Sequence, residues 1–191
     1  MKKATIIAAT IASALISGTA FAATGPYVQG QVGYSNSNVA DSAVNATSTS
    51  DEHIAGRISV GYVLLEKDKW DMGTELGWGS YGNTTATDSK GGSEKASTTA
   101  TDIDLVASYH INQKVSLITK GGLAYERLND NYADETNSSV KPLLGIGIGY
   151  NLSSHVQANL SYDHIFGDSS NTSGGVPTLD TVFAGVKYSF K

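Results

Sequence analysis

The chain has 191 residues, with 13 Lys+Arg against 18 Asp+Glu, a formal net charge of −5 and no cysteine. The acidic balance argues against nucleic-acid binding, and the lack of cysteine excludes a disulfide framework, thiolate chemistry and lipoprotein acylation. The length suits one domain.

The first 22 residues have the pattern of a cleaved secretory signal. Lys2 and Lys3 precede an uncharged apolar run that ends near residue 16, and Ala-Phe-Ala at 20–22 is the small-x-small pattern that signal peptidase reads. The run is shorter than the ~20 residues of a spanning helix. We expect a signal peptide over 1–22 and one mature domain over 23–191, with a formal charge of −7, destined for secretion, the periplasm or the outer membrane.

The mature chain alternates apolar and polar residues with period two, as β-strands do. None of the apolar-parity positions in these segments is Asp, Glu, Lys or Arg. A charge facing lipid at mid-depth costs roughly 2–4 kcal/mol, which explains that exclusion, although a soluble β-sandwich alternates in the same way. Eight such segments follow in chain order: 28–34, 54–62, 70–78, 103–109, 115–125, 140–150, 156–162 and 181–190.

The connectors between the segments alternate in length. Short turns at one end and long polar loops at the other are typical of outer-membrane barrels, and this order places both termini on the periplasmic side. The short connectors are 64–69, 112–114 and 151–154, and the long ones are 35–52, 80–100, 127–139 and 165–179.

Aromatic residues of the apolar parity gather at the segment ends. Amphipathic rings prefer the headgroup level of a membrane, whereas a sandwich core would hold them at mid-strand. We therefore predict an all-β fold, an eight-stranded antiparallel up-and-down transmembrane β-barrel. Its aromatic girdles would consist of Tyr62, Trp70, Tyr109, Tyr150, Tyr188 and Phe190 at the periplasmic rim, and of Tyr34, Trp78, Tyr125 and Tyr162 at the extracellular rim.

The opposite parity carries charged and amide side chains, which we expect to line the lumen. An eight-stranded barrel is just wide enough for side chains to fill, so these charges should pair across it. Glu75 is expected near mid-height, with Arg57 on the next strand and Lys120 across the lumen, below a second layer that includes Asp102 and Glu126. The predicted charge network consists of Arg57, Glu75, Asp104, Lys120, Lys141, Asp163 and Lys187.

The terminal strand carries the most specific pattern, with Gly185 followed by Tyr188 and Phe190. The mature chain, residues 23–191, resembles the small eight-stranded outer-membrane barrels, typified by the OmpA transmembrane domain, OmpX and the opacity-type surface proteins. That resemblance implies an outer-membrane location, contact with lipid and lipopolysaccharide, a monomer, and an assembly signal for the barrel-assembly machinery at these three residues. Two departures are Phe183, where a polar residue is usual, and the final Lys191.

The lumen charges allow two functional hypotheses. One is a structural polar plug. The other is a narrow gated pore, in which a bridge from Glu75 to Arg57 or Lys120 opens to let ions pass. Inward glycines would leave room for water and keep the pore hypothesis open; they are residues 73, 77, 79, 122, 145, 147 and 149.

Lipid-modifying catalysis is a weaker alternative, because a serine nucleophile needs a histidine base held by an acid or amide group. The candidates Asp163, His164, Ser169 and Ser170 fit no esterase motif. The four histidines lie on different strands and never at metal-ligand spacing. We therefore expect no enzyme activity, no metal and no cofactor.

The four long connectors hold nine acidic and three basic residues, a net charge of −6. This charge disfavours heparin-like polyanions. The negative charge suits two other kinds of partner better: a host or surface protein, and divalent cations shared with lipopolysaccharide phosphates. A protein partner would bind through the four loops, 35–52, 80–100, 127–139 and 165–179. A surface without a dedicated ligand is an equal alternative. We expect a non-enzymatic outer-membrane protein that serves envelope integrity or surface interaction.

Overall fold

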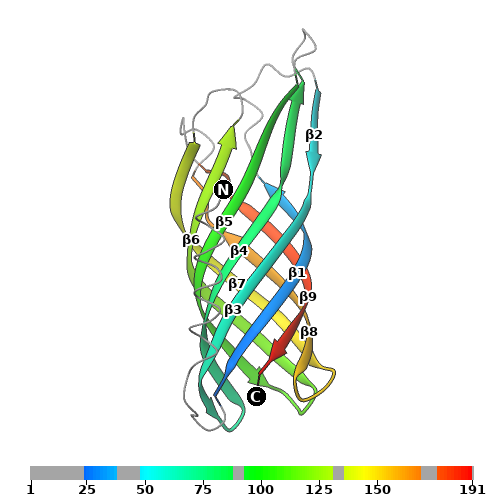
Figure 1. The fold of residues 1–191 in the computed structure, drawn as a ribbon, viewed down its shortest axis with the longest axis vertical. Helices are drawn as coiled ribbons and strands as arrows, with labels where there is room; N and C mark the ends of the chain where they lie inside the picture. Colours follow the sequence, from blue (N-terminus) through cyan, green and yellow to red (C-terminus); the bar gives the residue numbers. More distant parts are fainter. Residues whose placement is uncertain (1–23, 38–47, 88–92, 131–135, 169–175, 191) are drawn as a thin grey trace.

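A computed structural model describes residues 24–37, 48–87, 93–130, 136–168 and 176–190, so the predicted signal peptide lies outside the described residues. The strands form one antiparallel sheet that closes into a barrel (Figure 1). No helix among the described residues is long and apolar enough to cross a membrane. The strands are β1 (Pro26–Ser37), β2 (Ser48–Glu52), β3 (Ile54–Lys67), β4 (Trp70–Thr87), β5 (Ser93–His110), β6 (Val115–Asp130), β7 (Thr136–Asn151), β8 (Val156–Ile165) and β9 (Leu179–Ser189).

The first and last strands close the barrel, with Tyr27 opposite Ser189 and Ser37 opposite Leu179. Around the rest of the wall each strand pairs with its neighbours in the chain. Closure leaves the membrane-spanning strands without a free edge, so their backbone groups are paired within the wall. The predicted eight-stranded antiparallel barrel is confirmed.

The nine strand segments make eight barrel strands, because β2 and β3 are two parts of one strand interrupted at His53. Both parts pair with β4, where Glu52 lies opposite Asn83 and Gly56 opposite Ser80. The β4–β5 register shifts between Ser80 and Asn83, and the residue before Asn83, Gly82, has a φ of 104°. A bulge that needs this left-handed glycine therefore bends the wall at the level where β2 ends and β3 begins.

Along the strands the apolar side chains are exposed and the polar side chains are buried, which is the reverse of a soluble protein. Ile54 is 80% exposed and Val32 69% exposed, whereas Arg57 on the same strand as Ile54 is 1% exposed. A soluble sandwich would bury the apolar parity and solvate the other one. The apolar parity therefore faces outward, toward lipid.

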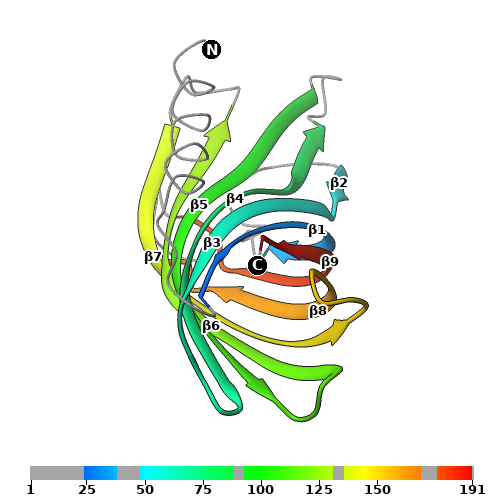
Figure 2. The same cartoon turned by 60° about the horizontal axis from the view of Figure 1, so that its bottom comes forward.

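Two of the predicted loops are wrong, because strands occupy most of 80–100 and 127–139. β4 and β5 pair as far as Thr87 and Ser93, and β6 and β7 pair as far as Asn129 and Thr136. These segments are rich in Ser, Thr and Asn and lack apolar alternation, yet threonine favours extended backbone and neighbouring strands supply the pairing. Figure 2 shows β4, β5, β6 and β7 extending well past β1, β8 and β9.

The short connectors lie at the opposite end, together with the first residue of β1 and the last of β9. Asp68 adopts a left-handed φ of 54° in the two-residue turn between β3 and β4, a conformation that aspartate tolerates. In the β5–β6 turn, the Asn112 side-chain oxygen accepts hydrogen bonds from the amides of Lys114 and Val115. Local side-chain bonds of this kind hold tight turns.

Candidate functional site

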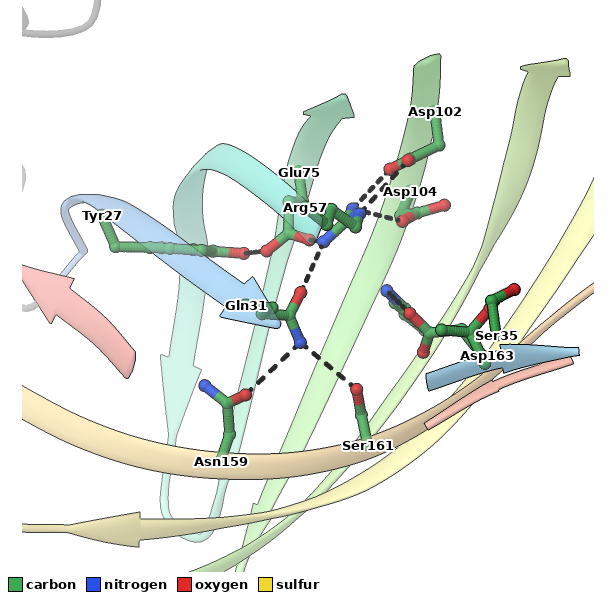
Figure 3. Close-up of polar contacts among 12 residues, drawn as sticks. Tyr27, Gln31, Ser35, Arg57, Glu75, Asp102, Asp104, Asn159, Ser161 and Asp163 are labelled. Carbon is green, nitrogen blue, oxygen red and sulfur yellow. Dashed lines mark hydrogen bonds and ion pairs between the residues drawn. The ribbon is translucent and has the colours of Figure 1, made fainter. Parts of the chain in front are cut away.

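The centre of the lumen is occupied by the guanidinium of Arg57, which is 1% exposed. Its Nη1 donates to Glu75 Oε1 at 2.8 Å and to Gln31 Oε1 at 3.1 Å, and its Nε donates to Asp102 Oδ1 at 3.2 Å. Its Nη2 donates to Asp102 Oδ2 and, at 3.4 Å, to Asp104 Oδ2 (Figure 3). All five guanidinium donors are thus used by residues from β1, β4 and β5.

The cluster continues toward the periplasmic end through Tyr27 and Gln31. The Tyr27 hydroxyl donates to Glu75 Oε2 at 2.9 Å. Gln31 Nε2 donates to Asn159 Oδ1 at 3.4 Å and to Ser161 Oγ at 3.3 Å, reaching β8 on the far wall (Figure 3). One hydrogen-bonded network therefore crosses the lumen.

Neighbouring side chains fill the space beside the glycines that face the lumen. A Cβ on Gly77 would lie 2.3 Å from Arg57 Nη2, and a Cβ on Gly145 would lie 2.7 Å from Lys120 Cε. A Cβ on Gly185 would lie 2.6 Å from Gln31 Cγ. The expectation that these glycines leave room for water is therefore wrong for Gly77, because the guanidinium of Arg57 occupies the space beside it. Gly145 lies against Lys120 and also lines a small cavity on the periplasmic side of the charged cluster.

Lys120 forms an ion pair with Asp163 at 2.6 Å, and both side chains are at most 8% exposed. Of the two bridges considered for Glu75, the one to Arg57 is formed, and the one to Lys120 is not, because Glu75 is held by Arg57 and Tyr27. The sequence also predicted that Asp102 belongs to a second layer of charges above Glu75. This is wrong, because Asp102 and Glu75 both form ion pairs with the guanidinium of Arg57.

An apolar layer adjoins the charged cluster on the side of the long hairpins, and the sequence interpretation missed it. The rings of Tyr81 and Phe183 meet edge-on with centroids 6.1 Å apart, and Phe183 is fully buried. Phe183, which stands where the resembling barrels usually have a polar residue, thus fills part of the lumen. The layer consists of Ala55, Tyr81, Ala100, Ala124, Leu143, Ile165, Leu179 and Phe183.

A small cavity of about 40 Å³ lies on the periplasmic side of the charged cluster. Most of its lining residues are polar, among them Gln29, Ser108, Lys120 and Asn159, and it has room for a few water molecules. The Lys187 ammonium lies beside it, 5.3 Å from the centroid of the Tyr27 ring. The cavity thus ends at the charged cluster on one side.

Two further charges that were expected in the lumen lie nearer the long hairpins. Lys141 forms an ion pair with Asp168, which follows β8. Glu126 is fully buried, and neither of its carboxylate oxygens has a hydrogen-bond partner within the described residues. Asp168 also accepts a hydrogen bond from the Val176 amide, and these two bonds hold its pKa below the ordinary value.

The predicted girdle and assembly residues take the following places. Trp70 and Tyr109 pack with ring centroids 4.8 Å apart, and Tyr188 and Phe190 meet edge-on at 5.0 Å, all near the end that carries the short turns. Gly185 lies opposite Gln31 across the β1–β9 seam. Tyr62 and Tyr109 are half-buried; the exposed aromatics are Tyr34, Trp70, Trp78, Tyr125, Tyr150, Tyr162, Tyr188 and Phe190.

The structure separates the residues of the candidate esterase site. Asp163 points into the lumen toward Lys120, whereas its neighbour His164 is on the outer face and contacts Asp180 Oδ1 at 2.6 Å. Ser169 and Ser170 lie outside the described residues. Asp163 therefore cannot serve as the acid of the candidate esterase site, and that candidate site is wrong in this residue. No group of three potential metal-ligating side chains occurs in the part of the chain that the structure describes.

A second histidine contact, also missed from the sequence, joins three strands at the periplasmic mouth. His110 Nε2 lies 2.7 Å from Asp71 Oδ2 and its Nδ1 lies 2.9 Å from Ser116 Oγ. The chain of acid, imidazole and hydroxyl looks like a catalytic relay, but Ser116 is fully buried, so a substrate has no access to its hydroxyl. We interpret it as a structural link.

Comparison with known proteins assigns the family. Residues 6–190 match the family described as the outer membrane protein beta-barrel domain. The chain belongs to this family. Its place is accordingly the outer membrane. An uncharacterized protein of Coxiella burnetii (strain RSA 493 / Nine Mile phase I) is 24% identical to this barrel over 212 residues, which cover 87% of this chain and 85% of the relative.

Two solved structures share the fold of this outer-membrane barrel. Neisserial surface protein A aligns with a TM-score of 0.63 and 14% identity, covering 87% of this chain and 99% of the other. Ail, the attachment invasion locus protein of Yersinia pestis, aligns with a TM-score of 0.50 and 14% identity, covering 86% and 98%. At these identities the likeness concerns the fold alone.

Proposed function

We propose that this outer-membrane barrel is a non-enzymatic, non-conducting surface protein that binds an extended segment of a host or surface protein along the edge strand β2. The observation that carries this proposal is a sheet that rises above the barrel and has an open edge. Strand addition at such an edge is a recurring mode of recognition, because main-chain hydrogen bonds supply affinity to an extended ligand.

The raised sheet consists of β2, β4, β5, β6 and β7. β4 continues nine residues past Trp78 of the expected extracellular girdle, from residue 79 to Thr87, which is roughly 30 Å along the strand at about 3.3 Å per residue. β5 pairs with it to Ser93, and β6 accompanies β5 to Asp130. Figures 1 and 2 show this wall standing above the shorter strands. The long connectors thus present a paired surface.

The open edge arises where β2 leaves the barrel. β1 accompanies β3 as far as the pair Tyr34–Ile54, and the Ser35 amide still donates to the His53 carbonyl. Beyond that point β2 pairs with β4, and no strand among the described residues pairs with its other side. An unpaired edge offers a row of backbone donors and acceptors.

The charge of the long connectors restricts the ligand. Their net charge of −6 disfavours sulfated polysaccharides. Ail has been solved in complex with the heparin analogue sucrose octasulfate, on a fold that aligns with a TM-score of 0.50. We infer a different ligand class for this chain, a protein segment without an acidic excess.

The filled lumen supports a non-conducting barrel. The Arg57 cluster and the apolar layer around Phe183 stand in series between the periplasmic cavity and the long hairpins. An ion would have to separate buried ion pairs and then cross a layer of apolar side chains, and both steps are costly. No comparable observation favours the gated-pore hypothesis.

The test compares two shortened hairpins in the refolded full-length barrel. Replacing 84–96 with Asn-Gly joins the cross-strand partners Asn83 and Ser97 and removes four of the five β4 residues that pair with β2. Replacing 129–136 in the same way joins Leu128 and Asn137 and serves as the matched control. The probes are immobilised fibronectin and laminin.

We expect the wild type and the control to bind one of these proteins, and the first variant to lose at least ten-fold in affinity. Equal binding by both variants would contradict the edge proposal. If the wild type binds neither protein, the surface-interaction role fails and a purely structural role is favoured. A shift in gel mobility on boiling shows that each variant is folded.

A further inference from the structure

A polar cluster lies on the outward face, just past the extracellular aromatic row. In the strand register, Tyr34 of β1 and Tyr162 of β8 both lie opposite Val182 of β9. The next outward residue on β9 is Asp180, which lies opposite His164. It stands about 7 Å further along the strand, at roughly 3.3 Å per residue. The cluster therefore borders the apolar band on the extracellular side.

One carboxylate oxygen holds the cluster together. Asp180 Oδ1 accepts a hydrogen bond from the Tyr162 hydroxyl and lies 2.6 Å from His164 Nδ1. A carboxylate only accepts, so Nδ1 must carry the proton, and Nε2 of a neutral imidazole is then an acceptor. Within the described residues neither Asp180 Oδ2 nor His164 Nε2 has a hydrogen-bond partner. The cluster thus has two acceptor atoms that its own hydrogen bonds do not use.

Aromatic rings flank these acceptors. Phe166 packs edge-on against His164 with centroids 4.3 Å apart, and it is 42% exposed. Tyr162 is 43% exposed, and the side chains of His164 and Asp180 are 27% and 30% exposed. The site is therefore reachable from outside the barrel and combines apolar faces with a polar edge, which suits an amphipathic ring.

The chemistry of the ligand follows from the two acceptors. A phosphate group is itself an acceptor and an anion, so it would be repelled by the Asp180 carboxylate. A sugar ring supplies hydroxyl donors along its edge and C–H groups on its faces. We propose that Tyr162, His164, Phe166 and Asp180 form a binding site for a sugar ring of a glycolipid headgroup in the outer leaflet. This site does not depend on the β2 edge.

The experiment measures lipid retention by the full-length barrel in detergent, using native mass spectrometry. The lipids are core-truncated lipopolysaccharide, its enzymatically dephosphorylated form, phosphatidylethanolamine and phosphatidylglycerol. The two phospholipids lack a sugar, and phosphatidylethanolamine supplies an ammonium donor instead. The test variants are Asp180→Ala and the milder Tyr162→Phe, which removes one hydroxyl. The matched control is His53→Ala, because His53 also packs against a rim tyrosine, Tyr34, but its Nδ1 contacts the backbone carbonyl of Ser35.

We expect the wild type to retain both forms of lipopolysaccharide in preference to either phospholipid. A hydrogen bond to a charged group contributes about 1.5–3 kcal/mol, so Asp180→Ala should weaken retention about ten-fold or more, and Tyr162→Phe less. His53→Ala should retain lipopolysaccharide like the wild type. Loss of retention on dephosphorylation would overturn the sugar assignment. Preference for phosphatidylethanolamine, or equal retention by all variants, would overturn the site.

Discussion

Arg57 Nη1 and Glu75 Oε1 lie 2.8 Å apart on neighbouring strands, and neither side chain is more than 4% exposed. Two charges in such a place stabilise a structure only when all their hydrogen-bonding groups are satisfied. Here Gln31, Tyr27, Asp102 and Asp104 supply the remaining partners. The pair is therefore the centre of a network that joins both sides of the barrel.

Removing the central cation should be strongly destabilising. Arg57→Met leaves buried carboxylates without their counter-charge, so we expect a loss of about 3–5 kcal/mol in the free energy of unfolding, measured by urea titration in detergent. The double variant Arg57→Met/Asp102→Asn removes one uncompensated charge and should recover part of that loss. Equal stability of Arg57→Met and wild type would show that the network contributes nothing.

Adding one methyl group next to the network should distinguish two glycines. In Gly77→Ala the new Cβ would lie 2.3 Å from Arg57 Nη2, so we expect a loss of about 1–3 kcal/mol. Gly56→Ala is the control, because no atom lies within 4 Å of its Cβ. Urea titration of both variants tests this, and a Gly56→Ala variant as unstable as Gly77→Ala would show that the contact with Arg57 does not set the cost.

Planar-bilayer recordings should show no single-channel steps for the wild-type barrel. The charged cluster and the apolar layer block the lumen in series, so Phe183→Ala alone should stay closed, and the double variant Arg57→Ala/Phe183→Ala should conduct. Channel steps in the wild type would revive the gated-pore hypothesis. Steps in Phe183→Ala alone would show that the charged cluster does not block ions.

Acid should release the segment that follows β8. Bonds from Lys141 and the Val176 amide hold the pKa of Asp168 below its ordinary 3.8, so the contact stabilises the folded state above that pH and is lost as the pH falls through the lowered value. The protection factor of the Val176 amide, which is its hydrogen-exchange rate relative to an unprotected amide at the same pH, should therefore be high at pH 7 and lower near pH 2. The Asp168→Asn variant should show low protection at both pH values, and high protection in that variant would contradict the linkage.

The terminal strand should be required for insertion. Deleting 188–191 removes Tyr188 and Phe190, which pack against each other at the periplasmic end of β9, next to the β1 seam. We expect the deletion to prevent surface exposure, measured by protease accessibility of whole cells, whereas deletion of Lys191 alone should have little effect. Normal exposure of the longer deletion would refute the assembly role of these residues.

The amino-acid sequence was sufficient to predict the membrane-spanning part of the eight barrel strands, their two faces and the closed barrel. Alternation with period two is a property of each strand alone, so Ile54 and Arg57 are assigned to opposite faces without any knowledge of their neighbours. The exclusion of charge from one face and the alternating connector lengths then favour a membrane barrel over a sandwich. These features are local in the chain, and local patterns are visible in a sequence.

The partners of each side chain depended on the tertiary structure. Arg57 meets Asp102, 45 residues away, because the register of β3, β4 and β5 brings them to one level, and a shift of one residue would turn the whole set outward. Register also joins His164 to Asp180 and fills the lumen with Phe183. The extension of β4 to β7 depends on pairing between Ser- and Thr-rich strands, which have no apolar face to reveal them.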